Sequence, residues 1–171
     1  RAGPHAGETR QGCSTTQPPA SATGAAGFIG RQLVLDLRGS GIPVRALLRP
    51  HHDGQDLEAA GAEILRGDAA DRILLREASA NCNVIYHLAA ARGQKKLSQA
   101  EYCEQNTRLQ DAVAEAALTN AARVIAASTV ATMRGHPPLA AADAPPRPVS
   151  RYALSRSQNE QQLHETWKDQ G

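Results

Sequence analysis

The stretch Thr23-Gly24-Ala25-Ala26-Gly27-Phe28-Ile29-Gly30 places three glycines at a regular spacing and runs directly into an apolar segment. The large aliphatic residues that follow recur at helical spacing up to residue 37, and breakers at residues 39–41 predict where the helix ends. A glycine-rich turn that opens a helix lets backbone N–H groups approach a pyrophosphate, and the helix N-terminus adds favourable partial charge. We therefore expect a phosphate cradle here. The alternative is a flexible loop before a helix, and the helix behind the turn favours the cradle.

The segments after this turn alternate between two periodicities. Short apolar segments predict strands, and segments with helical spacing lie between them. The five prolines of residues 136–148 predict a loop. This alternation is typical of an α/β fold, a doubly wound parallel sheet of the Rossmann-like kind with right-handed crossovers. The predicted strands are residues 44–48, 63–65, 84–88 and 123–127, and the predicted helices are 57–60, 72–78, 105–117 and 152–167.

The first 22 residues differ in composition from the rest of the chain. They contain almost no large aliphatic side chain, so they bury too little surface to offset the entropy lost on ordering. Pro18 and Pro19 also lie where the first strand of such a sheet would run, and proline is excluded from central strands. We therefore expect a disordered tail over residues 1–22, no regular strand within residues 13–22, and one folded domain over residues 23–171.

Bulk composition excludes several classes of protein. Hydrophobic residues make up 41% and charged residues 21% of the chain, which is ordinary for a globular domain. The net charge is +2 and the basic residues are scattered, so no nucleic-acid partner is expected. No apolar segment approaches the roughly 20 residues that span a bilayer, and the cytoplasm is the expected compartment. Cys13, Cys82 and Cys103 lack metal-ligand spacing, so we expect free thiols and no metal site.

Four further motifs follow the glycine-rich turn in a fixed order. They are Gly67-Asp68, His87-Leu88-Ala89-Ala90, Ser128-Thr129 and Arg147-Pro148-Val149-Ser150-Arg151-Tyr152. With the turn, they resemble over residues 23–167 the extended short-chain dehydrogenase/reductases of the NAD-dependent epimerase/dehydratase family. The resemblance implies an NAD(P)-binding domain over residues 23–171 that is truncated before the substrate-binding lobe, so that the fold is incomplete. It leaves a homodimer of the complete protein open.

The resemblance also implies where NADP or NAD is bound. At the end of the second strand, an acidic residue would favour NAD, whereas Arg49 suits the 2′-phosphate of NADP, which we expect to be preferred. The alternative is that Arg49 is a solvated loop charge. The neighbouring His51 and His52 are assigned no metal. The implied cofactor-binding residues are Gly24, Gly27, Phe28, Ile29, Gly30, Arg49, Asp68, Leu88, Ala89, Ala90, Asn106, Tyr152 and Arg156.

The same resemblance implies a reaction centre. Tyr152 is the general acid/base for the substrate hydroxyl or carbonyl, and Thr129 donates to the substrate oxygen, with Ser128 as the fallback. Phenols ordinarily titrate near pH ~10, so a cation must favour the phenolate. The family uses a lysine four residues after its tyrosine, and this chain has Arg156 there, which keeps the charge in a larger, planar group.

Two functions follow from these expectations. The first is an NAD(P)-dependent epimerase/dehydratase or carbonyl reductase that acts on a nucleotide-sugar or a related small hydroxyl or carbonyl substrate. The alternative is a non-catalytic NAD(P)-binding module or pseudoenzyme, which the arginine at position 156 favours. The segment Thr132-Met133-Arg134-Gly135 also departs from the family's Val-Tyr-Gly pattern and lacks its aromatic residue.

Overall fold

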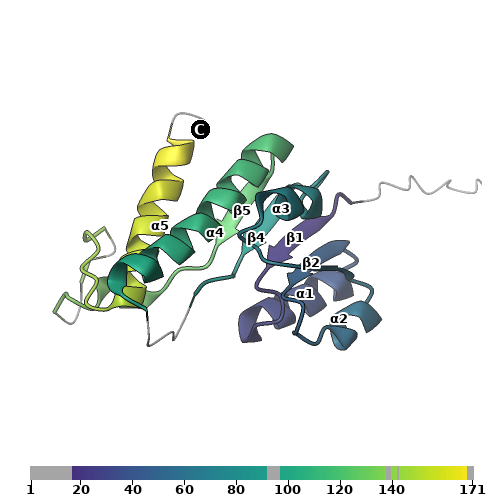
Figure 1. Ribbon diagram of the computed structural model, residues 1–171, viewed down its shortest axis with the longest axis horizontal. Helices are drawn as coiled ribbons and strands as arrows, with labels where there is room; N and C mark the ends of the chain where they lie inside the picture. Colours follow the sequence, from purple (N-terminus) through teal and green to yellow (C-terminus); the bar gives the residue numbers. More distant parts are fainter. Residues whose placement is uncertain (1–16, 92–96, 138–139, 142, 169–171) are drawn as a thin grey trace, which may run out of the picture.

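A five-stranded parallel sheet forms the centre of the molecule. The computed structural model describes residues 17–91, 97–137, 140–141 and 143–168, and its helices cover both faces of the sheet (Figure 1). The strand order is β3-β2-β1-β4-β5, so the direction of winding reverses between β1 and β4. This order confirms the predicted α/β, doubly wound, Rossmann-like fold. The strands are β1 (Ala20–Thr23), β2 (Val44–Leu48), β3 (Glu63–Arg66), β4 (Val84–His87) and β5 (Arg123–Ala126).

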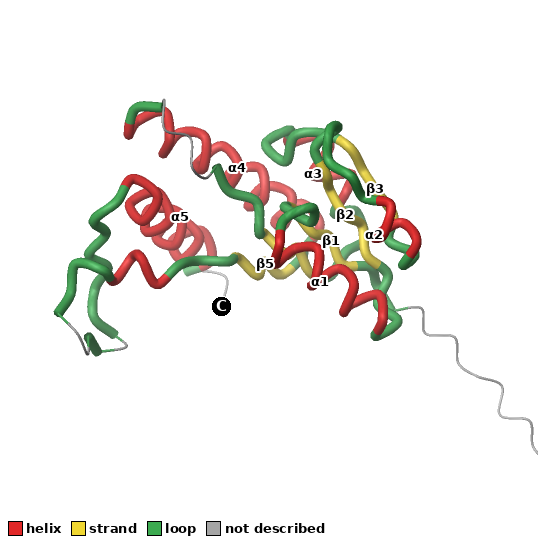
Figure 2. Tube along the Cα trace, turned by 90° about the horizontal axis from the view of Figure 1, so that it is seen from below, coloured by secondary structure: helices red, strands yellow, loops and turns green. Residues whose placement is uncertain are grey.

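The helices pack in two layers, and each layer has its own apolar cluster. Helices α1 (Phe28–Gly39) and α2 (Gln55–Ala59) lie on one face, where Val34 and Leu57 pack against Ala46 and Leu48 of β2. Figure 2 shows these two helices on the side away from α4 and α5. The opposite layer contains α3 (Arg72–Ala78), α4 (Gln99–Asn120) and α5 (Arg151–Trp167). None of the described helices is long and apolar enough to cross a membrane.

The prediction for the N-terminal segment was wrong at its end. Ala20–Thr23 forms the central strand β1, which pairs in parallel with both β2 and β4. Pro18 and Pro19 stop just before this strand, so neither has to donate to the ladder, and the Ala20 amide donates to the Pro43 carbonyl at 2.9 Å. All four side chains of β1 are at most 5% exposed. Small side chains therefore suffice here because helices cover both faces. Residues 1–16 lie outside the described residues.

Side-chain caps set several helix boundaries. Asp71 accepts from the amides of Ile73 and Leu74, and α3 spans the predicted residues 72–78. Helix α4 begins six residues before the predicted 105, because Ser98 and Glu101 form a reciprocal capping box. The Ser150 hydroxyl accepts from the Ala153 amide and begins α5, which carries the candidate reaction centre.

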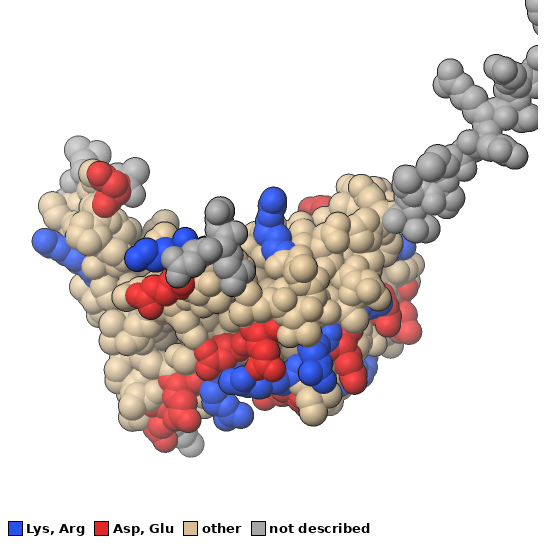
Figure 3. All heavy atoms as spheres, turned by 90° about the horizontal axis from the view of Figure 1, so that it is seen from above, with Lys and Arg blue, Asp and Glu red and all other residues tan. Residues whose placement is uncertain are grey.

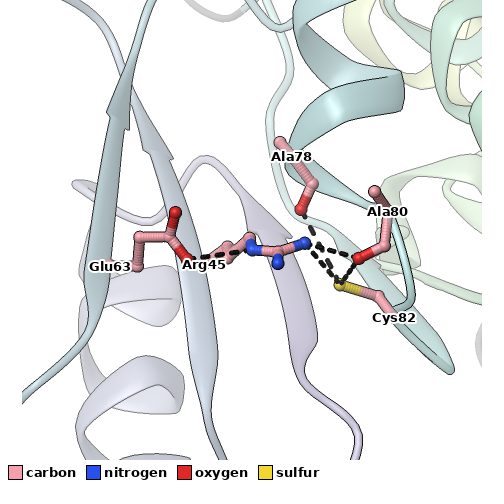
Figure 4. A network of polar contacts seen from close by, with 5 residues as sticks. All are labelled: Arg45, Glu63, Ala78, Ala80 and Cys82. Carbon is pink, nitrogen blue, oxygen red and sulfur yellow. Dashed lines mark hydrogen bonds and ion pairs between the residues drawn. The ribbon is translucent and has the colours of Figure 1, made fainter.

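A polar network joins strands at the amino end of the sheet, opposite the predicted site. Arg45 of β2 donates to the Glu63 carboxylate at 2.9 Å and to the Ala80 carbonyl, and its Nη1 lies 3.9 Å from the Cys82 sulfur (Figure 4). Cys82 is only 2% exposed, and burial raises the pKa of its thiol. The network thus ties β2 and β3 to the turn before β4, while the charge and hydrogen bond of Arg45 oppose the rise in the pKa of the thiol.

Charges of both signs lie close together on the surface. On the face shown in Figure 3, acidic and basic side chains alternate along one edge of the molecule. Arg72 of α3, for example, pairs with Glu115 of α4 and lies 3.9 Å from Asp111. These exposed pairs contribute little to stability individually, because solvent screens them.

Candidate active site

The glycine-rich turn passes so close to the neighbouring loop that side chains are excluded from it. Gly24 has a φ of +70°, and a Cβ there would lie 2.6 Å from the Ala89 nitrogen and 2.7 Å from the Leu88 carbonyl carbon. A Cβ on Gly30 would overlap the Gly24 carbonyl. Gly24 and Gly30 are therefore required by backbone packing, whereas Gly27 is exposed, and its amide donates to the Gly24 carbonyl at 3.0 Å and closes the turn.

A cavity of about 210 Å³ opens above this turn, at the carboxyl ends of four strands. Ligands of doubly wound sheets bind at this place, outside the strand ends where the winding reverses. Seven predicted cofactor residues line the cavity, so the fold brings them together from separate parts of the sequence. They are Gly24, Gly27, Arg49, Asp68, Leu88, Ala89 and Ala90, and they are joined by Ala26, Leu47, His52, Gly67, Ala69 and Leu109.

A buried hydrogen-bond network supports the floor of this cavity. Thr23 Oγ1 lies 3.0 Å from His87 Nδ1 and accepts from the Ala89 amide at 3.3 Å. His87 is 1% exposed. Burial, together with the charge of Arg156, lowers the pKa of His87 to about 3. The Thr23 oxygen therefore links the neutral His87 ring to the Ala89 amide. Sequence reasoning missed Thr23, whose signal was its position directly before the first glycine.

Six predicted cofactor residues lie outside the cavity lining: Phe28, Ile29, Gly30, Asn106, Tyr152 and Arg156. Phe28 and Ile29 are 97% and 64% exposed in the first turn of α1. Asn106 is instead buried between elements: its Oδ1 accepts from the Ala91 amide at 2.7 Å, and its Nδ2 donates to Ser155 at 3.1 Å. It therefore fastens the segment after β4 to α4 and α5. Asn106 thereby holds Ala91, which directly follows the cavity-lining residue Ala90.

Arg156 lies where α5 meets the carboxyl ends of β4 and β5. The residue is 4% exposed, and its guanidinium donates to the Ala127 carbonyl just after β5. Its Nε has no hydrogen-bond partner among the described residues. Its charge also reaches Glu160, where it opposes the rise in carboxyl pKa that burial causes. A buried cation with an unused donor therefore lies beside His87.

The other candidate catalytic residues surround Arg156 on α5 and on the segment after β5. Tyr152 is half-buried at the start of α5 and precedes Arg156 by one helical turn, so both lie on one helix face. Helix α5 packs against the short 3₁₀ helix η1 (Val130–Met133), which Thr129 caps by accepting from the Ala131 amide at 3.2 Å.

The neighbouring hydroxyls of Ser128 and Thr129 differ in their hydrogen bonds. The exposed Ser128 donates its proton to Glu160, whereas no described residue accepts the proton of Thr129. Thr129 is thus the hydroxyl left with a proton to donate. In the part of the chain that the structure describes, no group of three or more His, Cys, Asp or Glu side chains could hold a metal ion.

Comparison with known protein families agrees with this geometry. The sequence model of the NAD-dependent epimerase/dehydratase family matches residues 22–171. The chain belongs to this family. Membership confirms the resemblance inferred from the motifs and the prediction of NADP or NAD as the class of cofactor. The glycine cradle and the cavity at the strand ends fit such a dinucleotide.

Individual proteins are also similar to this chain. The chain is 34% identical over 144 residues to a 4-hydroxy-2-methyl-3-oxo-4-farnesyl-3,4-dihydroquinoline-1-oxide ketoreductase of Stigmatella aurantiaca, covering 81% of this chain and 43% of the relative. Its fold is similar to that of MoeE5, solved with UDP-glucose and NAD, with a TM-score of 0.73 at 30% identity over 86% of this chain and 48% of that one.

A more distant protein shares the fold. The UDP-N-acetylglucosamine 4-epimerase of Bacillus cereus superposes with a TM-score of 0.74 at 22% identity, over 91% of this chain and 52% of that one. The chain thus spans about half the length of these epimerase/dehydratase relatives.

Proposed function

We propose that this chain carries the NAD(P)-binding and catalytic part of an epimerase, dehydratase or carbonyl reductase acting on a nucleotide-sugar or a related hydroxyl or carbonyl compound. One observation carries the proposal. The cavity at the strand ends is lined by the glycine cradle, while the buried Arg156 and the neighbouring Tyr152 approach the same end of the sheet from α5. The ketoreductase relative and the UDP-glucose complex of MoeE5 support the substrate class.

The residues of the cavity divide the work of binding. Backbone amides in the first turn of α1 would hold the pyrophosphate, because the N-terminus of a helix has unpaired N–H groups and a partial positive charge; the Gly27 amide itself donates to the Gly24 carbonyl at 3.0 Å. Asp68 faces the adenine end, where its carboxylate can accept from an exocyclic amine. Arg49, which has no ion-pair partner among the described residues, favours a 2′-phosphate and hence NADP.

The reaction centre needs only proton chemistry from this chain. A bound nicotinamide supplies or accepts hydride at the substrate carbon. Tyr152 exchanges a proton with the substrate oxygen, and Thr129 donates a hydrogen bond to that oxygen. Arg156, one helical turn after Tyr152, places a buried positive charge beside this end of the site. Since the chain spans about half of its relatives, the activity is proposed for the complete protein that contains it.

Two measurements test the proposal. Titration of the chain with NADPH, followed by nicotinamide fluorescence, should show saturable binding. In the complete protein, Tyr152→Phe should abolish turnover of carbonyl substrates with little change in NADPH affinity, because only the acid/base is removed.

Tyr86→Phe is the matched control. Tyr86 lies on β4, packs against the core beneath α1 and lines no part of the cavity, so the loss of its hydroxyl should leave turnover unchanged. Absence of NADPH binding would contradict the proposed NAD(P)-binding role. Binding without turnover in the complete wild-type protein would instead identify the non-catalytic module, which the reductase relative does not favour.

A further inference from the structure

The turn that follows β2 is held rigidly against the cavity. The His52 amide donates to the Arg49 carbonyl at 3.0 Å and closes the turn. From the end of β3, Arg66 donates to the His52 carbonyl at 2.8 Å and lies 3.5 Å from the Pro50 carbonyl. One guanidinium nitrogen of Arg66, Nη1, therefore makes both contacts with the backbone of the turn. It positions the turn and leaves the side chains of the turn free.

Two of those side chains face the same space. Arg49 and His52 both line the cavity with the glycine cradle, while the exposed His51 does not. The rings of His51 and His52 meet edge to face, with centroids 4.5 Å apart and an interplanar angle of 70°. His52, which is half-buried, is thus the histidine of this pair that lines the cavity.

The charges that act on His52 come from His51 and Arg49, and no carboxylate is paired with His52 or Arg49 among the described residues. Desolvation and the charges of His51 and Arg49 lower the pKa of His52. Three carboxylates of the neighbouring segments have other partners: Asp53 accepts from the Gln55 amide, Asp68 accepts from the Ala70 amide, and Asp56 pairs with Arg31. Two further cations belong to these segments. Arg66 donates to backbone carbonyls, and Arg108 lines the adjoining hollow with Arg49.

Resting on the proposed function, we propose that His52 is a specificity residue: it binds the 2′-phosphate of NADP together with Arg49, so that the preference for NADP over NAD increases as the pH falls. A phosphate monoester presents three acceptor oxygens, more than the fork of one guanidinium satisfies. An imidazolium on the same rigid turn supplies a second charged donor. The anion also relieves the repulsion between His52 and its cationic neighbours.

The direction of the pH dependence follows from linkage. Without a ligand, His52 is neutral near pH 7, because its pKa lies below the ordinary value. A bound phosphate dianion raises that pKa, so binding takes up a proton. The affinity therefore rises as the pH falls between the bound and free pKa values, by at most about tenfold per pH unit. Below about pH 6 the gain stops, because the phosphate itself becomes protonated.

The test is a pair of fluorescence titrations, with NADPH and with NADH, at several pH values from about 8 to about 6 in phosphate-free buffer of constant ionic strength. The ratio of the two affinities should rise about five- to tenfold across this range in the wild-type chain. His52→Gln keeps a hydrogen-bond donor without the charge, so its ratio should stay near the wild-type value at pH 8. His51→Gln is the matched control and should keep the rise.

The possible outcomes are distinct. A flat ratio in the wild-type chain, or an equal rise in His52→Gln, overturns the inference while NADPH binding leaves the proposed function intact. Failure of both dinucleotides to bind contradicts the proposed function instead. Adenosine 2′-monophosphate should compete with NADPH more strongly at pH 6 than at pH 8, and inorganic phosphate at the same concentration should not. Equal competition by inorganic phosphate would identify a general anion site and overturn the assignment.

Discussion

Replacement of Gly24 by alanine tests the close approach that shapes the cavity. The residue has a φ of +70°, and the added Cβ would lie 2.6 Å from the Ala89 nitrogen and 2.7 Å from the Leu88 carbonyl carbon. The left-handed conformation alone costs about 1–2 kcal/mol for a residue with a Cβ. The overlap adds about 1–3 kcal/mol, because both contacts are backbone atoms that no side-chain rotation can relieve. We expect a total loss of about 2–5 kcal/mol.

Gly41→Ala is the control that separates these two costs. Gly41 has a φ of +80°, but nothing lies within 4 Å of the Cβ that alanine would add. This variant should lose only the conformational part, about 1–2 kcal/mol. Urea denaturation measures the free energy of unfolding of both variants. Fluorescence titration should also show that Gly24→Ala weakens NADPH binding at least about tenfold, since the loop after β4 must shift.

The reasoning would be refuted by equal destabilisation of the two alanine variants. That result would mean that the turn and the Leu88–Ala89 backbone can separate at no cost. The shape of the cavity floor would then not depend on the close contact between Gly24 and the Leu88–Ala89 backbone. Loss of stability in Gly24→Ala with unchanged NADPH affinity would show that the overlap is real but lies away from the bound dinucleotide.

Three further predictions concern the charged residues of the site. Arg49→Ala should weaken NADPH binding about 10- to 100-fold and NADH binding far less, because charge-assisted hydrogen bonds are lost; equal losses in fluorescence titrations would exclude the 2′-phosphate contact. In the complete protein, Arg156→Lys should raise kcat more than it changes cofactor affinity, because a compact ammonium suits proton relay. If the arginine and lysine versions have equal kcat values, and Tyr152→Phe abolishes turnover in both, arginine suffices for the reaction. His87 should make the free energy of unfolding depend on pH, because its pKa is about 3 in the folded protein and about 6.5 in the unfolded chain. The stability present above pH ~6.5 should be lost on acidification by up to ~1.4 kcal/mol per pH unit. Urea denaturation at several pH values should show a smaller dependence of the unfolding free energy on pH for His87→Asn.

Local pattern was enough for most of the elements. The predicted bounds of β2 and α3 match residues 44–48 and 72–78, because an apolar run before breakers and a helix capped by Asp71 are local features. The start of α4 was missed although its signal, Ser98 followed by Glu101 three residues later, is also local. The motif order placed Arg49, Asp68 and residues 88–90 at strand ends, where the structure brings them into one cavity.

The sequence by itself therefore determined the alternation of strands and helices, the glycine turn and the family, since these depend on residue spacing and on allowed backbone angles. Tertiary structure alone decided the rest. The four small residues of β1 have no strand signal of their own and become a central strand only because β2, β4 and two helix layers enclose them. The neutral state of His87 and the buried charge of Arg156 depend in the same way on distant elements, since desolvation is set by what packs around a group and not by its neighbours in the chain.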